Sequence, residues 1–243
     1  MKYLAQTGNI TEEAKMTDYN RVVLDNTDGN VYIKSQFNFV DLGLPSGTLW
    51  MDRNIGAKEI TDYGLYFQWG DIQGYTANEI EVRHIKQFDW TDYKYANGAP
   101  DKLTKYCNDS DYGNDGYTDN LTELELSDDA AYAYTNGKCK MPTQTQFIEL
   151  INGCTYEWTT KDGVTGGLFT SKTNNNSIFI PDSRHYGNYH KYSTTYLWCT
   201  TLEDTDVLDG YTMEVSKDKA ESEDYSGLTK FYGVAIRGVF KTN

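Results

Sequence analysis

Short apolar runs separated by turn-forming residues make up most of this chain, and their spacing predicts strands more often than helices. The clearest turn is Leu44–Gly47, where a proline fixes one backbone angle and a glycine permits another that most residues resist. The apolar run Thr48–Met51 follows directly and predicts a buried strand, with Trp50 as its core anchor. Asp52 and Arg53 come next, and we expect them to form a polar lid over the tryptophan.

Further runs of the same kind predict more strands. Residues 62–71 combine aromatic side chains with flanking glycines, which indicates a buried strand that leads into a loop. The C-terminal part of the chain is rich in such runs: Thr155–Thr160, Ser177–Pro181, Tyr196–Thr200, Tyr211–Val215 and Phe231–Phe240. We assign Trp198 and Arg237 to structure, and we expect the arginine to pair with a buried acid.

Two segments have helix signals. Leu121–Ala133 ends in an alanine-rich stretch, and Ser127 or Asp128 is its candidate cap. The stronger signal is Thr143–Gly153, where a threonine caps the start, Gln146 completes a capping box and a glycine ends the helix. Its apolar face consists of Phe147, Leu150 and Ile151. Two helices among many short antiparallel strands predict an α+β domain with long loops.

Residues 1–36 differ from the rest of the chain. The turn signal Asn26–Gly29 separates two β-rich runs, Arg21–Asp25 and Asn30–Lys34, which predicts a hairpin. A lone hairpin is marginal in water, so it must pack on the main domain, on a sister chain or on a larger object. We expect residues 1–36 to be an attachment or oligomerisation arm, with a simple edge extension as the alternative, and residues 37–243 to form the main domain.

Residues 72–120 are polar and rich in turn formers, so we expect a long loop pinned to the domain by aromatic anchors. These anchors are Phe88, Trp90, Tyr93 and Tyr95. Within the loop, Asp109–Asp119 is dense in carboxylates and suggests a calcium site. The EF-hand pattern fails, because Gly113 occupies its fifth position and no glutamate its twelfth. A solvated acidic loop is therefore the default, and calcium is the alternative.

Charge and composition narrow the class of partner. The formal net charge is −14, from 22 basic and 36 acidic residues. A nucleic-acid-binding protein needs a basic footprint, so this balance argues against nucleic acid and disfavours anionic membranes. No apolar run is long enough for a membrane span, so we expect no membrane insertion. The 21 tyrosines and 21 glycines are typical of adaptable binding surfaces and equally of loop-rich β proteins.

The cysteines carry no recognisable site. Cys107, Cys139, Cys154 and Cys199 form no CxxC pair, which disfavours a zinc ribbon or a thioredoxin-type centre. The first residues show no apolar signal-peptide segment, so we expect the chain to be made in the cytosol with reduced thiols. We therefore expect the four cysteines to be free and mostly buried. The alternative is that they form two disulfides. No nucleophile elbow, phosphate loop or dinucleotide glycine pattern is present, and we expect no catalytic residue and no cofactor.

The most ligand-like stretch is His185–Tyr196. Its aromatic residues recur every three or four positions and are broken by glycine and asparagine, which is typical of a loop that presents rings outward. Tyrosine offers flat apolar area with a polar tip, which suits sugars and protein epitopes. With a second polar loop at Asp218–Tyr225, the candidate ligand-binding residues are Tyr186, Tyr189, His190, Tyr192, Tyr196 and Tyr225. The alternative is that half of these rings pack on the domain. The histidines lack companion ligands, so we expect no metal.

Seven segments of the chain form a set whose order carries a resemblance to a known family. They are Val40–Trp50, Asp62–Gly70, Asp128–Ala131, Met141–Thr143, Ser177–Pro181, Leu197–Thr201 and Tyr232–Arg237. Together they resemble the C-type-lectin-like fold in its formylglycine-generating-enzyme-like branch, and more closely a paralogous-domain family of gut bacterial surface proteins and their phages. The resemblance implies that the terminal strands pair near each other and that loops between the later strands carry a ligand surface. Lys140 and Gly238 depart from the arginine and proline usual in this pattern. The paired catalytic cysteines of the enzymes have no match, so the resemblance implies binding rather than turnover.

This resemblance and the arm together predict a non-enzymatic phage virion surface protein, such as a head-fibre or tail-associated receptor-binding subunit. Its expected partners are a host cell-surface glycan or protein, a capsid or other virion protein held through residues 1–36, and further copies of the chain. We expect a homo-oligomer, with a trimer favoured, because several weak contacts then act together. The alternatives are a bacterial secreted or cell-surface ligand-binding module and, ranked last, an enzyme of the same fold.

Overall fold

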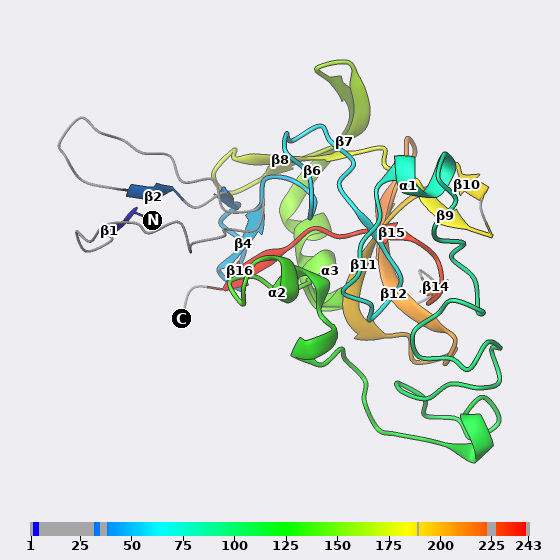
Figure 1. Cartoon of the computed structure of the whole chain (residues 1–243). Coiled ribbons are helices and arrows are strands. Elements are labelled where there is room, and N and C mark those ends of the chain that lie inside the picture. The colour runs from blue at the N-terminus through cyan, green and yellow to red at the C-terminus, as the bar shows by residue number, and fades with distance from the viewer. Residues whose placement is uncertain (1, 5–31, 35–37, 189, 223–226, 242–243) are drawn as a thin grey trace. The chain divides into compact units, whose positions relative to one another are not determined.

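The computed structural model describes residues 2–4, 32–34, 38–188, 190–222 and 227–241 (Figure 1). The chain divides into two compact units, Met1–Asn38 and Phe39–Asn243. In the first unit, β1 (Lys2–Leu4) pairs antiparallel with β2 (Tyr32–Lys34). The other half of the expected hairpin, residues 21–25, and its turn lie outside the described residues, so that hairpin remains a prediction.

The first sheet of the second unit joins the two ends of that unit. Its order is β16-β4-β3, and its strands are β3 (Phe39–Asp41), β4 (Thr48–Met51) and β16 (Val239–Lys241). All neighbours run antiparallel, and Trp50 stands opposite both Val40 and Val239. The turn before β4 is closed by a 2.9 Å hydrogen bond from the Gly47 N–H to the Leu44 carbonyl. The strand predicted over Thr48–Met51 is thereby confirmed.

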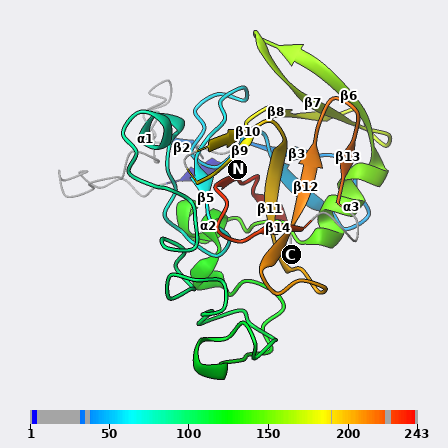
Figure 2. The same ribbon diagram turned by 90° about the vertical axis from the view of Figure 1, so that its right-hand side faces the viewer.

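The largest sheet has the order β13-β12-β11-β15-β5, with β14 also paired to β12. Its strands are β5 (Tyr66–Phe67), β11 (Thr195–Leu202), β12 (Asp209–Val215), β13 (Ala220–Glu221), β14 (Gly227–Thr229) and β15 (Val234–Ala235). Only the β11–β15 pair is parallel. Figure 2 shows β11 and β12 side by side in the middle of this unit.

The expected single strand Phe231–Phe240 is wrong, because the chain passes from one sheet to the other at Arg237. The buried guanidinium donates hydrogen bonds to Asn54 Oδ1 at 2.9 Å and to the carbonyls of Met51 at 3.0 Å and Phe179 at 2.8 Å. These contacts hold the break between β15 and β16. The expected carboxylate partner of Arg237 is wrong as well, since all three acceptors are uncharged.

Two smaller sheets complete the strand inventory of the described residues. One is β6 (Cys154–Lys161), β7 (Val164–Ser171) and β8 (Ser177–Pro181), and the other is β9 (His185–Gly187) with β10 (His190–Tyr192). The β6–β7 turn places Asp162 and Gly163 at positive φ, the backbone that a two-residue Asp-Gly hairpin turn requires. Ser177–Pro181 is a strand with the predicted bounds.

The described residues contain three α-helices rather than the expected two: α1 (Ala77–Glu81), α2 (Ala130–Tyr134) and α3 (Gln144–Gly153). Helix α3 has the predicted Thr143 cap and capping box. Helix α2 starts later than expected, since residues 126–128 form the 3₁₀ turn η2 (Leu126–Asp128) and the Asp129 carboxylate caps Tyr132 at 2.9 Å. A second 3₁₀ turn, η1, spans Asn114–Gly116. Helix α1 was missed because only Ile80 is apolar and buried in it.

The main core lies between α3 and the sheets, and Trp50 anchors it as predicted. Its ring is fully buried and stacks on Phe147 at 5.9 Å between centroids. Trp198 is also fully buried and donates to the Phe67 carbonyl at 2.8 Å. All four cysteines are free and buried, which confirms the expectation for the thiols. The coarse prediction, a mixed α/β fold of mostly short strands with long loops, is confirmed.

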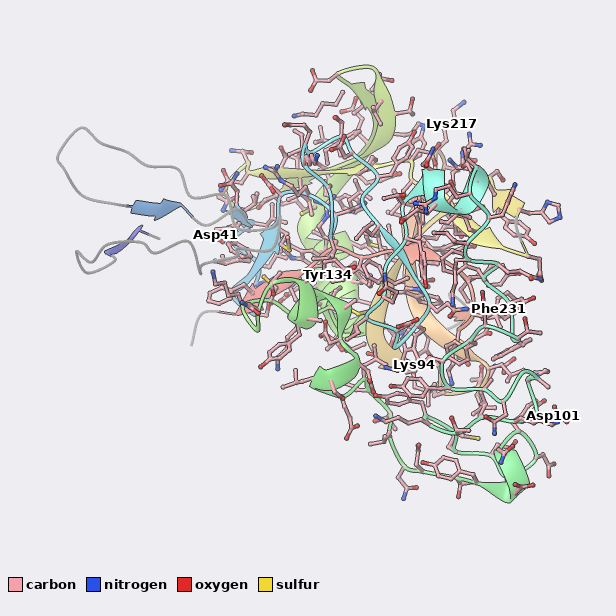
Figure 3. All side chains as sticks on the ribbon, in the orientation of Figure 1. Asp41, Lys94, Asp101, Tyr134, Lys217 and Phe231 are labelled. Atoms are coloured by element: carbon pink, nitrogen blue, oxygen red, sulfur yellow. The ribbon has the colours of Figure 1, made fainter. Side chains whose placement is uncertain are left out.

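Aromatic anchors pin the long loop as predicted: Phe88 and Tyr93 are buried, and Trp90 and Tyr95 pack against the cluster that contains Tyr93. A buried carboxylate also holds the loop. Asp128 accepts hydrogen bonds from Lys94 at 3.1 Å, Lys105 at 2.6 Å and the Tyr106 hydroxyl at 2.7 Å. Burial alone would raise the pKa of this carboxyl, but the hydrogen bonds from Lys105, Tyr95, Tyr106 and Lys94 hold it well below its usual range. Figure 3 labels Lys94 on this part of the chain.

Candidate ligand-binding surface

The short β9–β10 hairpin carries the candidate site. It pairs His185 with Tyr192 and Tyr186 with Lys191. Two hydrogen bonds tie it to the C-terminal segment: Tyr186 N–H to the Gly233 carbonyl at 2.9 Å, and the reverse at 2.8 Å. The Asn188 N–H also donates to the Phe88 carbonyl at 3.0 Å. The hairpin is therefore held by backbone bonds to two distant segments.

Two glycines let aromatic rings lie directly on this backbone. A Cβ at Gly187 would stand 2.3 Å from the Tyr232 ring, and one at Gly233 would stand 2.6 Å from the Phe88 ring. Real side chains do not approach so closely, so both positions require glycine. The Tyr232 ring is thereby seated against the hairpin.

An aromatic cluster extends from this contact. His185 stacks on Tyr192 with centroids 4.9 Å and planes 7° apart, and it meets the Tyr232 ring edge-on at 5.4 Å. We call the whole set the aromatic surface: Trp90, His185, Tyr192, Tyr196, Phe231 and Tyr232. Tyr192 is its most exposed member at 38%, and its other tyrosines are half-buried. Figure 3 shows Phe231 on the side of the unit that carries the hairpin.

Helix α1 fastens the hairpin through one carboxylate. The Tyr186 hydroxyl donates to Glu81, and Lys191 Nζ lies 3.2 Å from the same oxygen. The Tyr186 ring packs edge-on against Tyr66 at 4.6 Å. The hydrogen bond from Tyr186 lowers the pKa of Glu81 more than burial raises it. We call this arrangement of Glu81, Tyr186 and Lys191 the carboxylate latch.

His185 is a buried, neutral support for the surface rather than a displayed group. Burial lowers its pKa, although the contact between Nδ1 and the Thr194 carbonyl at 2.7 Å acts in the opposite direction. Because a carbonyl only accepts, Nδ1 carries the proton. The uncharged ring can then stack on Tyr192 with little cost in desolvation.

The predicted ligand-binding residues differ in how far they are exposed to solvent. Tyr186 is fully buried, so the expectation that its ring faces outward is wrong: the ring packs on Tyr66, and the hydroxyl donates to the exposed Glu81. His190 and Tyr192 are exposed, and Tyr196 is half-buried. Tyr189 and Tyr225 lie outside the described residues. Thus Tyr192 and Tyr196 come together with His185 around one cluster.

Sequence reasoning missed Tyr232 and Phe231, and it took Trp90 for a simple loop anchor. Both residues belong to the run Phe231–Phe240, for which the sequence predicts a single strand. The sequence does contain one indication of this contact: in both Tyr186-Gly187 and Tyr232-Gly233 a tyrosine precedes a glycine. In the structure the Tyr232 ring packs directly on Gly187. The distance in sequence between them hid their contact.

Carboxylates of the acidic loop bond to backbone N–H groups. Asp109 accepts the Asp111 N–H at 2.9 Å, and Asp119 accepts those of Tyr106 at 2.7 Å and Leu121 at 3.1 Å. These carboxylates satisfy backbone donors in the turns. Across the described residues, no group of three or more histidine, cysteine, aspartate or glutamate side chains is arranged to hold a metal ion.

Comparisons with models of protein families, with curated proteins and with solved structures gave no match for this chain. The family resemblance drawn from its motifs therefore remains a prediction. Among the helices in the described part of the chain, none has the length and apolar character needed to cross a bilayer.

Proposed function

We propose that this chain is a non-enzymatic recognition module that presents its aromatic surface to a glycan or protein on a host cell. The observation that carries the proposal is the exposed Tyr192 ring, stacked on a buried neutral His185 and flanked by Tyr232. Such rings offer rigid apolar area with hydroxyl groups at the edge. The apolar face of a sugar ring can lie on this area while its hydroxyls bond to the phenols.

The finer fold we propose is C-type-lectin-like. Two features support it: the β16-β4-β3 sheet brings the first and last strands of the second unit together, and four residues of the aromatic surface, His185, Tyr192, Phe231 and Tyr232, lie on the β9–β10 hairpin and the segment between β14 and β15. Both are what the motif resemblance implies.

We further propose that the protein belongs to the surface of a phage virion, as a head-fibre or tail-associated subunit. The motif resemblance and the separate first unit, Met1–Asn38, support this assignment. In this proposal, the first unit binds a capsid or other virion protein and assembles copies of the chain, with a trimer favoured. Repeated aromatic surfaces would then bind a cell with high avidity.

The test is a glycan array and whole-cell binding assay on wild type, Tyr192→Ala and Tyr232→Ala. Each substitution should weaken binding at least about ten-fold, or about 1.4 kcal/mol, because each removes a contact ring. The matched control is Tyr112→Ala, since Tyr112 is similarly exposed, at 36%, on the acidic loop. Melting temperatures should separate loss of binding from loss of folding. Unchanged binding by both variants, or equal loss in the control, would contradict the proposal.

A further inference from the structure

Strand β6 forms the longest free sheet edge in the described part of the chain. It is eight residues long, and among the described residues it pairs only with β7, at one end of the order β6-β7-β8. Every other strand at the edge of a described sheet has five residues or fewer. Figures 1 and 2 show the tip of the β6–β7 hairpin standing out from the rest of the second unit.

The hydrogen-bond pattern of the hairpin decides which backbone groups face this edge. The Lys172 N–H donates to the Gly153 carbonyl at 3.0 Å, one step beyond the last pair of the β6–β7 ladder. In an antiparallel pair, alternate residues exchange hydrogen bonds with their partners. The odd-numbered residues of β6 therefore bond to β7, and the N–H and C=O groups of Tyr156, Trp158 and Thr160 point away from it. Within the described ranges, no backbone group of another segment bonds to them.

Several devices that usually block a free edge are missing from β6. Its ladder with β7 runs through eight consecutive pairs without a bulge, and the strand contains no proline. The side chains that face the core, Tyr156 and Trp158, are rings rather than inward-pointing charges. Sheets normally shorten, bend, cover or charge their edges, because unpaired N–H and C=O groups recruit another strand. An edge as long and regular as this one is suited to accept such a strand.

Two other edges of the second unit are covered by side chains. The Phe179 carbonyl in β8 accepts a hydrogen bond from Arg237 at 2.8 Å. The Asp41 carbonyl in β3 accepts hydrogen bonds from the side-chain amides of Asn174, at 2.9 Å, and Asn176, at 2.7 Å. An open edge is therefore not a general feature of these sheets.

The charged residues of β6 define what an added strand must carry. Glu157 and Lys161 are exposed and share one face of the sheet with Thr159, since side chains two residues apart point the same way. Among the described residues neither forms an ion pair. Opposite charges on facing strands stabilise the pair, and like charges destabilise it. A matching segment has a base opposite Glu157, an acid opposite Lys161 and apolar residues on the side of Trp158.

The net charge favours a different protein over a second copy as the source of this strand. Each copy has a formal net charge of −14, and like net charges oppose association. A segment with positive net charge is attracted to the same edge. Charge complementarity thus points to a basic partner.

We propose that the open edge of β6 binds an extended, positively charged segment of a partner protein as an added antiparallel strand. Main-chain hydrogen bonds to Tyr156, Trp158 and Thr160 hold the segment, and Glu157 and Lys161 select its register. The inference does not depend on the function proposed for the aromatic surface.

The test is hydrogen exchange measured by NMR on the full chain during titration with the peptide acetyl-Glu-Val-Thr-Val-Lys-Ile-Lys-amide. In antiparallel register its glutamate stands opposite Lys161 and its first lysine opposite Glu157. We expect saturable binding that slows exchange at the amides of Tyr156, Trp158 and Thr160, while the amides already bonded to β7 change little. A control peptide with proline in place of both valines lacks two N–H donors that face β6, and it should not bind.

Two substitutions separate the main-chain contacts from the charge contacts. Thr160→Pro removes an outward N–H and no β6–β7 bond, so the melting temperature should stay within about 4 °C of wild type, while peptide binding weakens about ten-fold. Glu157→Lys places like charges opposite each other and should weaken binding about three-fold or more. The matched control is Glu59→Lys, at an exposed glutamate outside the sheets, which should bind the peptide like wild type.

Absence of saturable binding would overturn the proposal, and so would equal binding of the proline peptide. Protection confined to other amides, wild-type affinity in Thr160→Pro, or an equal loss in Glu59→Lys would also overturn it. If exchange at the three edge amides slows as the protein concentration is raised without peptide, a second copy occupies the edge, and the partner proposed here is wrong.

Discussion

Among the described residues, two buried cations, Arg237 and Lys230, form no ion pair with a carboxylate. Arg237 donates to Asn54 and to two carbonyls, and Lys230 Nζ donates to the carbonyls of Tyr106, at 3.0 Å, and Val207. Lys230 also lies over the Trp69 ring, 5.2 Å from its centroid. Burial lowers the pKa of Arg237 to about 9 and that of Lys230 to about 7. Each cation bonds to segments that are far apart in the chain. The lowered pKa of Lys230 should be measurable in the pH dependence of the free energy of unfolding.

Lys230→Met should change how stability depends on pH. The folded-state pKa of Lys230 is lowered, so between pH 7 and its ordinary value the unfolded chain binds more protons. This lysine therefore makes the free energy of unfolding rise with pH, by up to about 1.4 kcal/mol per unit. The four buried thiols, whose pKa values are raised by burial, act in the opposite sense, so the comparison must be with wild type.

Urea unfolding at pH 7, 8 and 9 measures the effect. The stability of wild type relative to Lys230→Met should increase over this range, while Lys161→Gln should follow wild type. Parallel profiles for wild type and Lys230→Met would show that the lysine keeps an ordinary pKa.

At the scale of elements, the carboxylate latch explains why a three-residue hairpin strand can hold a ring in place. Glu81 at the end of α1 serves both Tyr186 and Lys191, and it adds side-chain contacts to the backbone hydrogen bonds that tie the β9–β10 pair to Gly233 and Phe88. Two-stranded hairpins are marginal in water, so contacts outside the pair decide their order. The display of Tyr192 thus depends on a helix more than a hundred residues earlier in the chain.

Glu81→Ala should loosen the hairpin and weaken ligand binding without unfolding the protein. It removes the acceptor of the Tyr186 hydroxyl proton, which costs about 1–2 kcal/mol. Hydrogen exchange at the Tyr186 and Asn188 amides should accelerate, and Glu157→Ala, a change at another exposed glutamate, should leave it unchanged. Because the pKa of Glu81 is lowered on folding, its contribution is present above the ordinary glutamate pKa and is lost as pH falls below it. Unaltered exchange would exclude the latch.

Elements whose bonds are local could be predicted, and those fixed by distant contacts could not. Helix α3 carries its whole start signal between Thr143 and Gln146. The break after β15 depends on Arg237 reaching Asn54, and the sequence there continues to look like a strand. Burial of Tyr186 likewise depends on Glu81, so the spacing of rings in its own segment could not reveal it. For the candidate site, the spacing of aromatic residues indicated Tyr192, whereas the contact of Tyr232 with the same cluster is visible only in the fold.

At the scale of the whole molecule, the second unit contains its own closing sheet and its own core. The buried hydrophobic residues of the second unit extend from Leu42 to Val239. The sheet β16-β4-β3 uses no strand of the first unit. The second unit therefore has the means to fold by itself.

Deletion of residues 1–36 should leave a folded, monomeric domain that no longer assembles. The melting temperature should change by less than about 3 °C, since the core is untouched. Light scattering coupled to size exclusion would give the mass of both forms. A truncated protein that still forms oligomers would place the assembly contacts in the second unit, and an unfolded one would reject the arm as a separate attachment element.

The four enclosed, unbridged cysteines have a consequence for where such a molecule can operate. No covalent cross-link contributes to this interior, so the fold does not have to wait for an oxidant or an isomerase. Burial also raises the pKa of each sulfur, which suppresses the thiolate that oxidants attack. The chain can therefore be synthesised where glutathione is abundant and remain intact in aerated surroundings, with the same bonds in both places.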